Sequence, residues 1–122
     1  MMLTTNKYRN KKIKNAHGTF DSIKEYERFL YLSAAQKKGL ISELTRQKKF
    51  TLIPSQRDVY GRVVERECSY RADFCYRKNG KLIVEDVKSE ITRKNHEYII
   101  KRKLMLYIMK IKINEVCTRI LT

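Results

Sequence analysis

Two carboxylates and a lysine fall close together in residues 69–90, which read SYRADFCYRKNGKLIVEDVKSE. Asp73 lies in the first half of this stretch, and Asp86 and Lys88 follow an apolar run in the second half. The Asn-Gly dipeptide between the two halves is a strong signal for a two-residue hairpin turn. We therefore predict a β-hairpin in which Asp73 and Asp86 lie on adjacent strands.

The spacing of these residues indicates what chemistry they could do together. Side chains alternate between the two faces of a strand, so Asp86 and Lys88 point the same way while Glu85 points the other way. Paired carboxylates suit Mg²⁺, which takes one or two of them together with water and substrate phosphates. Such a cation polarises a phosphoryl oxygen and lowers the pKa of water, and a neighbouring lysine balances the developing charge. The pattern predicts hydrolysis of a phosphodiester bond.

Two other interpretations of the same residues stay open. A register shifted by one residue would make Glu85 the second acid. We favour Asp86 because it shares a strand face with Lys88. Charged residues on an exposed edge strand also protect a sheet against aggregation, so the Asp-x-Lys triplet could be ordinary surface.

A third carboxylate is expected from a helix near the N-terminus. The segment FDSIKEYERFLYLSAAQKKG, residues 20–39, offers Asp21 or Ser22 as its N-cap and Gly39 as its stop. Glu25 stands three residues after Ser22, at the capping-box position. It also lies at the edge of the stripe that helical spacing predicts to be packed, namely Tyr26, Phe29, Leu30 and Ser33.

The rest of the chain supplies the elements that must position these acids. A strand is predicted at residues 47–54, ended by Pro54, and a polar loop returns as a second strand around residues 62–65. A second helix should run through residues 96–110, capped by Thr92 or Asn95, and residues 111–116 alternate like a closing strand. The predicted fold is α+β, with a mixed central sheet flanked by helices.

Composition bounds the partners and the setting. The chain has 122 residues, enough for one domain with its own core. Its 28 Lys and Arg against 13 Asp and Glu give a net charge of +15, which indicates a polyanionic partner, nucleic acid first. Three cysteines without a CxxC pair fit a reducing compartment. With no apolar run of membrane-spanning length and no signal-peptide core, we expect a cytoplasmic protein without a membrane partner.

Basic residues also suggest where DNA would be contacted. Residues 1–19 contain no acid and read as a flexible basic arm preceding a single domain at residues 20–122. This arm is either a solvated tail or a segment that follows the phosphate backbone. The candidate DNA-binding residues are Lys7, Arg9, Lys11, Lys12 and Lys14 in the arm, Arg71 on the strand of Asp73, and Lys101 and Lys103 on the second helix.

The stretches FDSIKE, YRADF and GKLIVEDVK, taken in this order, resemble the PD-(D/E)xK nuclease superfamily. More narrowly, they are similar to its small phage-encoded branch, which is related to endonuclease I-type Holliday-junction resolvases. The resemblance covers residues 20–116 and implies an αβββαβ restriction-endonuclease-like core. Two positions depart from the family motif, since Ala72 stands where many members have proline, and Asp86 is the shorter of the two acids that the motif allows.

The resemblance implies roles for particular residues. By position, Asp73, Asp86 and Lys88 match the motif, and Glu25 matches the acid that such resolvases draw from their first helix. These acids, with the backbone carbonyl of Val87, would hold Mg²⁺ or Mn²⁺. The activity implied is endonucleolytic cleavage of DNA, in particular of branched DNA, by a homodimer working in the cytoplasm of a bacterial host.

Two alternatives remain beside a junction-resolving enzyme. The chain could be a non-catalytic basic nucleic-acid-binding protein whose acids are structural. It could also be a nuclease of the same fold with a role in repair, restriction or DNA packaging, because the metal motif does not determine which DNA shape is recognised.

Overall fold

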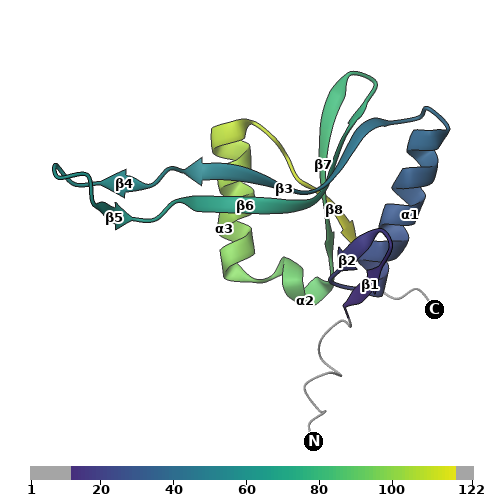
Figure 1. Ribbon diagram of the computed structural model, residues 1–122, viewed down its shortest axis with the longest axis horizontal. Helices are drawn as coiled ribbons and strands as arrows, with labels where there is room; N and C mark the ends of the chain where they lie inside the picture. The colour runs from purple at the N-terminus through teal and green to yellow at the C-terminus, as the bar shows by residue number, and fades with distance from the viewer. Residues whose placement is uncertain (1–11, 118–122) are drawn as a thin grey trace, which may run out of the picture.

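A four-stranded mixed sheet forms the centre of the molecule (Figure 1). The computed structural model describes residues 12–117. The strands lie in the order β3-β6-β7-β8, with the first two pairs antiparallel and the last pair parallel. Their bounds are Ser42–Ile53 for β3, Cys68–Lys78 for β6, Lys81–Lys88 for β7 and Asn114–Cys117 for β8.

Helices pack on both faces of this sheet. Helix α1 (Ile23–Lys37) contributes to one buried cluster, and helix α3 (His96–Leu104) with its π-helical continuation η2 (Met105–Met109) contributes to the other. A short helix, α2 (Glu90–Arg93), follows β7 directly. In chain order the core reads α1-β3-β6-β7-α3-β8. This confirms the predicted α+β fold, with helices flanking a mixed sheet.

The hairpin of β6 and β7 follows from its turn residues. Asn79 and Gly80 both have positive φ, at 52° and 78°, which is the backbone that a tight hairpin turn with the twist of the strands requires. Lys78 pairs with Lys81 across the turn, and the ladder continues to Phe74 and Glu85. The predicted hairpin is confirmed, and its register places Asp73 next to Asp86.

Helix α1 begins as predicted but turns a different face inward. The Ser22 hydroxyl accepts a hydrogen bond from the Glu25 backbone N–H at 3.0 Å, so Ser22 is the N-cap. Leu32 is buried, whereas Leu30, which we placed within the packed stripe, is exposed. The helix therefore rests on the sheet through the side that carries Glu25, Phe29 and Leu32. Helical periodicity alone did not fix this rotation.

Part of the predicted flexible arm is folded. Strands β1 (Ile13–Asn15) and β2 (Gly18–Phe20) form a small hairpin. It is attached to the domain by Phe20, which is fully buried, and by the guanidinium of Arg46, which lies 3.7 Å from the Phe20 ring centroid. The expectation of a flexible arm over residues 1–19 is thus corrected for this hairpin, while residues 1–11 lie outside the described part.

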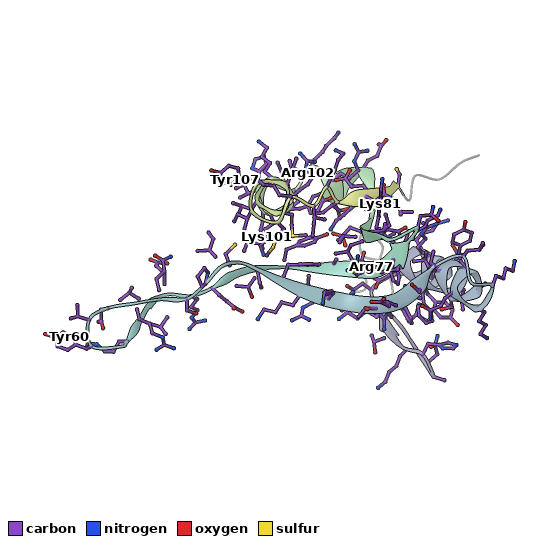
Figure 2. The ribbon with its side chains drawn as sticks, turned by 90° about the horizontal axis from the view of Figure 1, so that it is seen from above. Tyr60, Arg77, Lys81, Lys101, Arg102 and Tyr107 are labelled. Atoms are coloured by element: carbon purple, nitrogen blue, oxygen red, sulfur yellow. The ribbon has the colours of Figure 1, made fainter. Side chains whose placement is uncertain are left out.

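Strands β3 and β6 continue beyond the other two strands of the sheet as a two-stranded ribbon (Figure 1). Strand β3 is longer than predicted, and past Pro54 the chain continues into a small antiparallel pair, β4 (Gln56–Arg57) and β5 (Val63–Glu65). Figure 2 shows Tyr60 at the far end of this projection, away from the helices. The expected polar loop thus contains the short strand β4, and the return strand predicted around residues 62–65 is present as β5.

No helix within residues 12–117 combines the length and the apolar character needed to cross a bilayer.

Candidate active site

The site lies where strands β6 and β7 separate. The backbone ladder between β6 and β7 ends at the pair Phe74 and Glu85. Beyond this pair, the side chains of two aspartates make the hydrogen bonds between the strands. Asp86 Oδ1 accepts a hydrogen bond from the Asp73 backbone N–H at 3.0 Å, and Asp73 Oδ2 accepts one from the Val87 backbone N–H at 2.9 Å. Each carboxylate thus binds the neighbouring strand's backbone. This exchange holds the two acids side by side, as the hairpin prediction required.

Asp86 is almost completely buried, with 2% of its surface exposed. Its Oδ2 accepts a hydrogen bond from the Tyr70 hydroxyl and lies 3.5 Å from Lys88 Nζ. Burial, reinforced by the negative charge of Asp86, raises the pKa of Tyr70, so this hydroxyl remains a donor. Asp86 and Lys88 therefore share one face of β7, as the alternation of the strand predicted.

Glu25 joins the two aspartates from helix α1. Its Oε1 accepts a hydrogen bond from the Asp21 backbone N–H at 3.2 Å, so the predicted capping box is not closed onto Ser22. Its Oε2 accepts a hydrogen bond from Gln47 Nε2 at 3.3 Å and lies 3.7 Å from an Arg46 guanidinium nitrogen. The same Gln47 nitrogen donates to Asp73 Oδ1 at 3.2 Å. One amide group thus links the helix acid to the strand acid.

Glu85, the alternative second acid, faces the other way. It is fully buried and accepts two hydrogen bonds from the Arg28 guanidinium, at 2.9 and 2.6 Å, and one from the Tyr76 hydroxyl. Arg28 belongs to α1, so this cluster fastens the helix to β7. Glu85 therefore stabilises the packing of α1 on the sheet, and Asp86 is the acid that faces Asp73 and Lys88.

The grouping of acids changes their protonation. Burial, together with the negative charges of Asp86 and Glu25, raises the pKa of Asp73 to about 8. Burial also raises the pKa of Glu25, opposed in part by the hydrogen bond from the Asp21 backbone N–H. An ordinary aspartate titrates near 3.8, so the gathered carboxylates around Asp73 keep a shared proton to a higher pH unless a cation neutralises their charge.

We expect this proton to show in the pH dependence of stability. Between pH 3.8 and about 8 the folded chain holds a proton at Asp73 that the unfolded chain releases, so the free energy of unfolding falls as the pH rises through this window. Urea denaturation of wild type and Asp73→Asn without divalent cations measures this. The stability of wild type relative to the variant should decrease from pH 4.5 to 8, and a constant difference would contradict the shift.

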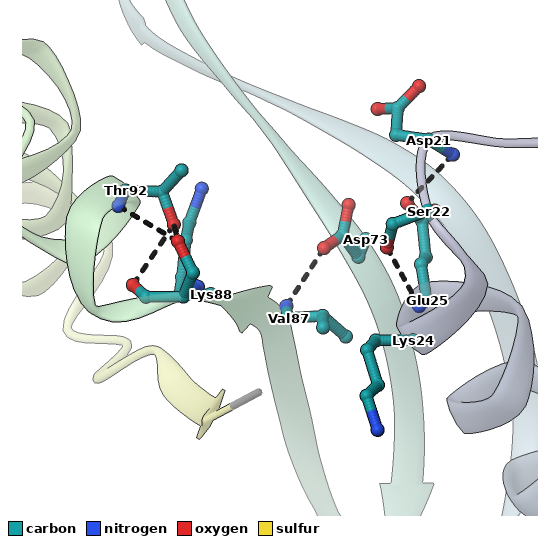
Figure 3. A pocket seen from close by; sticks show the side chains of 9 residues that line it. Asp21, Ser22, Lys24, Glu25, Asp73, Val87, Lys88 and Thr92 are labelled. Carbon is teal, nitrogen blue, oxygen red and sulfur yellow. Dashed lines mark hydrogen bonds between the residues drawn. The ribbon is translucent and has the colours of Figure 1, made fainter. Parts of the chain in front are cut away.

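Two adjoining hollows meet at these residues. One, of about 220 Å³, is shown in Figure 3 and is lined by α1, the end of β7 and α2; its lining residues include Lys24, Glu25, Asp73, Lys88 and Thr92. The other, of about 370 Å³, is lined from β3, β6, β7 and α3, and includes Gln47, Arg71, Asp73, Asp86, Lys88 and Lys101. Asp21, Asp73 and Lys88 line both hollows, so the two hollows adjoin at these residues, and we call them together the recess.

The candidate DNA-binding residues divide into several groups. Arg71 and Lys101 line the recess, and Lys101 Nζ lies 3.0 Å from Glu97 Oε2. Lys103 instead lines a separate hollow of about 470 Å³ between α3 and β8. Lys12 and Lys14 are exposed at the N-terminal hairpin. Lys7, Arg9 and Lys11 lie outside the described residues.

The recess contains carboxylates that could hold a divalent cation through oxygen. Within residues 12–117, no group of three or more His, Cys, Asp or Glu side chains could by itself hold a metal ion. Mg²⁺ does not require such a cage, because it keeps several waters and takes one or two carboxylates. The raised pKa values of Asp73 and Glu25 reflect burial and gathered negative charge, which a cation would neutralise. Asp73 and Asp86 are the residues that would hold it.

Three residues of the site were missed from the sequence. Gln47 and Arg46 reach it from β3, and Tyr70 reaches it from the start of β6. Their only signal is position: Arg46 and Lys48 pair with Phe74 and Ala72, which brings Gln47 opposite Asp73. That register depends on where β3 bulges, which no local pattern shows.

Comparison with known proteins adds one finding. Residues 5–120 match a family model described as "Protein of unknown function (DUF1064)". No curated protein and no solved structure matches the chain. The match includes the N-terminal hairpin, the whole sheet and every residue of the recess.

Proposed function

The chain belongs to the DUF1064 family of proteins of unknown function, and we propose that it is a metal-dependent DNA endonuclease. One observation carries the proposal. Asp73 and Asp86 lie at the separation of two central strands, with Lys88 beside them and Glu25 linked to Asp73 through Gln47. Acids that gather at a strand end, next to a lysine and open to a recess, match the needs of phosphodiester hydrolysis.

The cation would be Mg²⁺ or Mn²⁺, held by Asp73 and Asp86 with Glu25 and the Val87 carbonyl as further candidates. When bound, it supplies a Lewis acid for a phosphoryl oxygen and lowers the pKa of a water molecule. The protein's own part is to hold the acids in place. Hydrogen bonds from the Val87 and Asp73 backbones fix the orientation of the two aspartates, so little reorganisation is needed.

Lys88 is the group that would stabilise the negative charge of the phosphate or help to deprotonate the water. Its Nζ lies 3.5 Å from Asp86 Oδ2 and 4.3 Å from the centroid of the Tyr98 ring. The carboxylate and the ring face both hold the Lys88 side chain at this position. If Lys88 or a metal-bound hydroxide acts as the base, cleavage should become faster towards alkaline pH.

DNA would reach the acids through the basic walls of the recess. Arg71 and Lys101 line one side and Lys24 lines the other. With the net charge of +15, these residues would bind phosphates and release counterions, so binding should weaken steeply with salt. The contacts would be to the backbone and would carry little sequence information.

The direct test is cleavage of end-labelled DNA. Wild-type protein is incubated with a four-way junction, a flap and a linear duplex, with Mg²⁺ or with EDTA. We expect Mg²⁺-dependent cuts, most efficient in the junction. Binding of all three substrates without any cleavage, under either Mg²⁺ or Mn²⁺, would contradict a nuclease.

A second candidate is a basic nucleic-acid-binding protein without catalysis. One observation favours it, because each carboxylate oxygen of Asp73 and Asp86 already accepts a hydrogen bond within the protein. Such acids could serve the fold alone. This candidate predicts salt-dependent DNA binding that divalent cations and the substitution Asp86→Ala leave unchanged.

We propose that the enzyme cuts branched DNA as a homodimer, because the resolution of a four-way junction requires two paired cuts. The projecting ribbon is the surface on which we place the second copy. Residues 54–67 carry three arginines and three acids, so this segment is neutral in a chain of net charge +15. Two such chains repel each other least there. Val59, Tyr60, Val63 and Val64 are also exposed on it.

We expect Val63→Lys to convert a dimer into a monomer in sedimentation experiments at micromolar concentration. A lysine adds charge to a neutral, apolar strand edge, which opposes pairing of edges. Leu40→Lys, at an exposed apolar position near the end of α1, is the matched control and should leave the dimer intact. A monomeric wild type, or equal effects of both substitutions, would show that the ribbon is not the interface.

A further inference from the structure

Gln47 adopts an unusual backbone in the middle of strand β3. Its φ is 54°, in the left-handed region that side-chain-bearing residues seldom enter. Its two neighbours stay in the ladder, since Arg46 pairs with Phe74 and Lys48 with Ala72. A strained residue inside an otherwise continuous strand persists when its surroundings hold it there, and such residues gather at functional sites.

The strain coincides with a change of the buried face along the ribbon. Tyr70 and Ala72 pack in the cluster of α3, whereas Phe74 and Tyr76 pack in the cluster of α1. Residues two apart in a regular strand lie on the same face, so the strand cannot be regular between Ala72 and Phe74. Gln47 stands opposite this point, and Asp73 lies within it.

The side chain of Gln47 uses this position to reach two acids. Its Nε2 donates hydrogen bonds to Glu25 Oε2 at 3.3 Å and to Asp73 Oδ1 at 3.2 Å. Its backbone carbonyl accepts a hydrogen bond from Arg71 at 3.1 Å. A neutral amide thus lies between carboxyl groups whose negative charges oppose each other. It supplies donors without adding a full charge.

We propose that Gln47 is a positioning residue of the metal site. Its carboxamide holds Glu25 and Asp73 together while the site is empty, and the strained backbone of Gln47 aims it between them. When a divalent cation binds these acids, the amide keeps both carboxylates oriented towards it. This inference rests on the proposed function, since it assumes that the acids bind a cation.

Two substitutions separate the amide from the backbone. Gln47→Gly accepts a positive φ without strain but removes the amide. Gln47→Glu keeps the length of the side chain but places another carboxylate against the two acids. Gln36→Glu is the matched control for the added charge, because Gln36 is exposed on α1 and a carboxylate can still accept the hydrogen bond from the Leu44 backbone N–H.

The experiment measures thermal unfolding with and without Mn²⁺, and Mn²⁺ affinity by calorimetry, in the absence of DNA. Gln47→Gly should bind Mn²⁺ about 10- to 100-fold more weakly than wild type, the usual loss for a residue that orients metal ligands. Gln47→Glu should melt at a lower temperature than wild type without metal, and Mn²⁺ should raise its melting temperature by more than it raises that of Gln36→Glu.

Two results would overturn the proposal, and they differ in meaning. If wild type binds Mn²⁺ and both Gln47 variants respond to it as wild type does, Gln47 is only a strand residue and the metal site stands. If wild type itself binds no Mn²⁺, the metal site falls and the role of Gln47 falls with it. Should Gln47→Glu fail to fold, the affinity of Gln47→Gly decides alone.

Discussion

Replacing Asp73 by Asn is expected to slow DNA cleavage by about a hundredfold to a thousandfold, the range for losing one preorganised electrostatic group, while DNA binding is retained. The amide keeps the shape of the side chain and can still accept the hydrogen bond from the Val87 backbone, but it lacks the charge that holds a cation. The fold should tolerate the change, because burial and the neighbouring acids already oppose ionisation of Asp73 and raise its pKa.

Cleavage of the labelled junction under single-turnover conditions measures this effect, and filter binding with EDTA measures affinity. Glu27→Gln is the matched control, since it removes one negative charge from the exposed side of α1. It should cleave at nearly the wild-type rate. Full activity of Asp73→Asn would show that the carboxylate of residue 73 is not part of the catalytic centre.

Replacing Glu85 by Ala should instead destabilise the protein. The change leaves the Arg28 guanidinium and the Tyr76 hydroxyl without their shared acceptor. Removing one partner of a buried ion pair costs several kcal/mol, and because Arg28 keeps some contact with water we expect about 3 kcal/mol. Urea denaturation measures the loss.

The double substitution Arg28→Met with Glu85→Met serves as its control. It removes both charges and should recover part of the stability, because no buried charge is then left unpaired. If Glu85→Ala were as stable as wild type but inactive, the acid that binds the cation would be Glu85 and not Asp86.

The Glu85 cluster also has a consequence for the site. Arg28 lies one helical turn after Glu25 on α1, and Glu85 directly precedes Asp86 on β7. The ion pair between Arg28 and Glu85 therefore joins the helix that carries one acid to the strand that carries another. A residue can thus act on the site from the opposite face of the sheet.

Much of this arrangement could be predicted from local sequence signals. The Asn-Gly turn and the alternation of β7 placed Asp73, Asp86 and Lys88 together, since hairpin register and strand faces follow from the backbone itself. Ser22 as the N-cap followed from side-chain hydrogen bonding that spans only three residues. Elements defined by such short-range physics were the ones predicted correctly.

Long-range packing explains what could not be predicted. The buried face of α1 depends on the sheet below it, so Leu30 and Leu32 could not be ranked from the helix alone. The hairpin of residues 13–20 is attached to the domain through Phe20, which packs against Arg46, a residue distant in sequence. Gln47 reaches the site from a left-handed backbone conformation that it adopts within β3.

Calorimetric titration of Mn²⁺ into DNA-free protein tests most directly whether Asp73 and Asp86 together form a cation site. We predict saturable binding to wild type and to Glu97→Gln, which removes an exposed charge from the rim of the same recess, and loss of that binding in Asp86→Ala. Equal binding by wild type and Asp86→Ala, or no binding by wild type, would contradict a metal-dependent nuclease at this site.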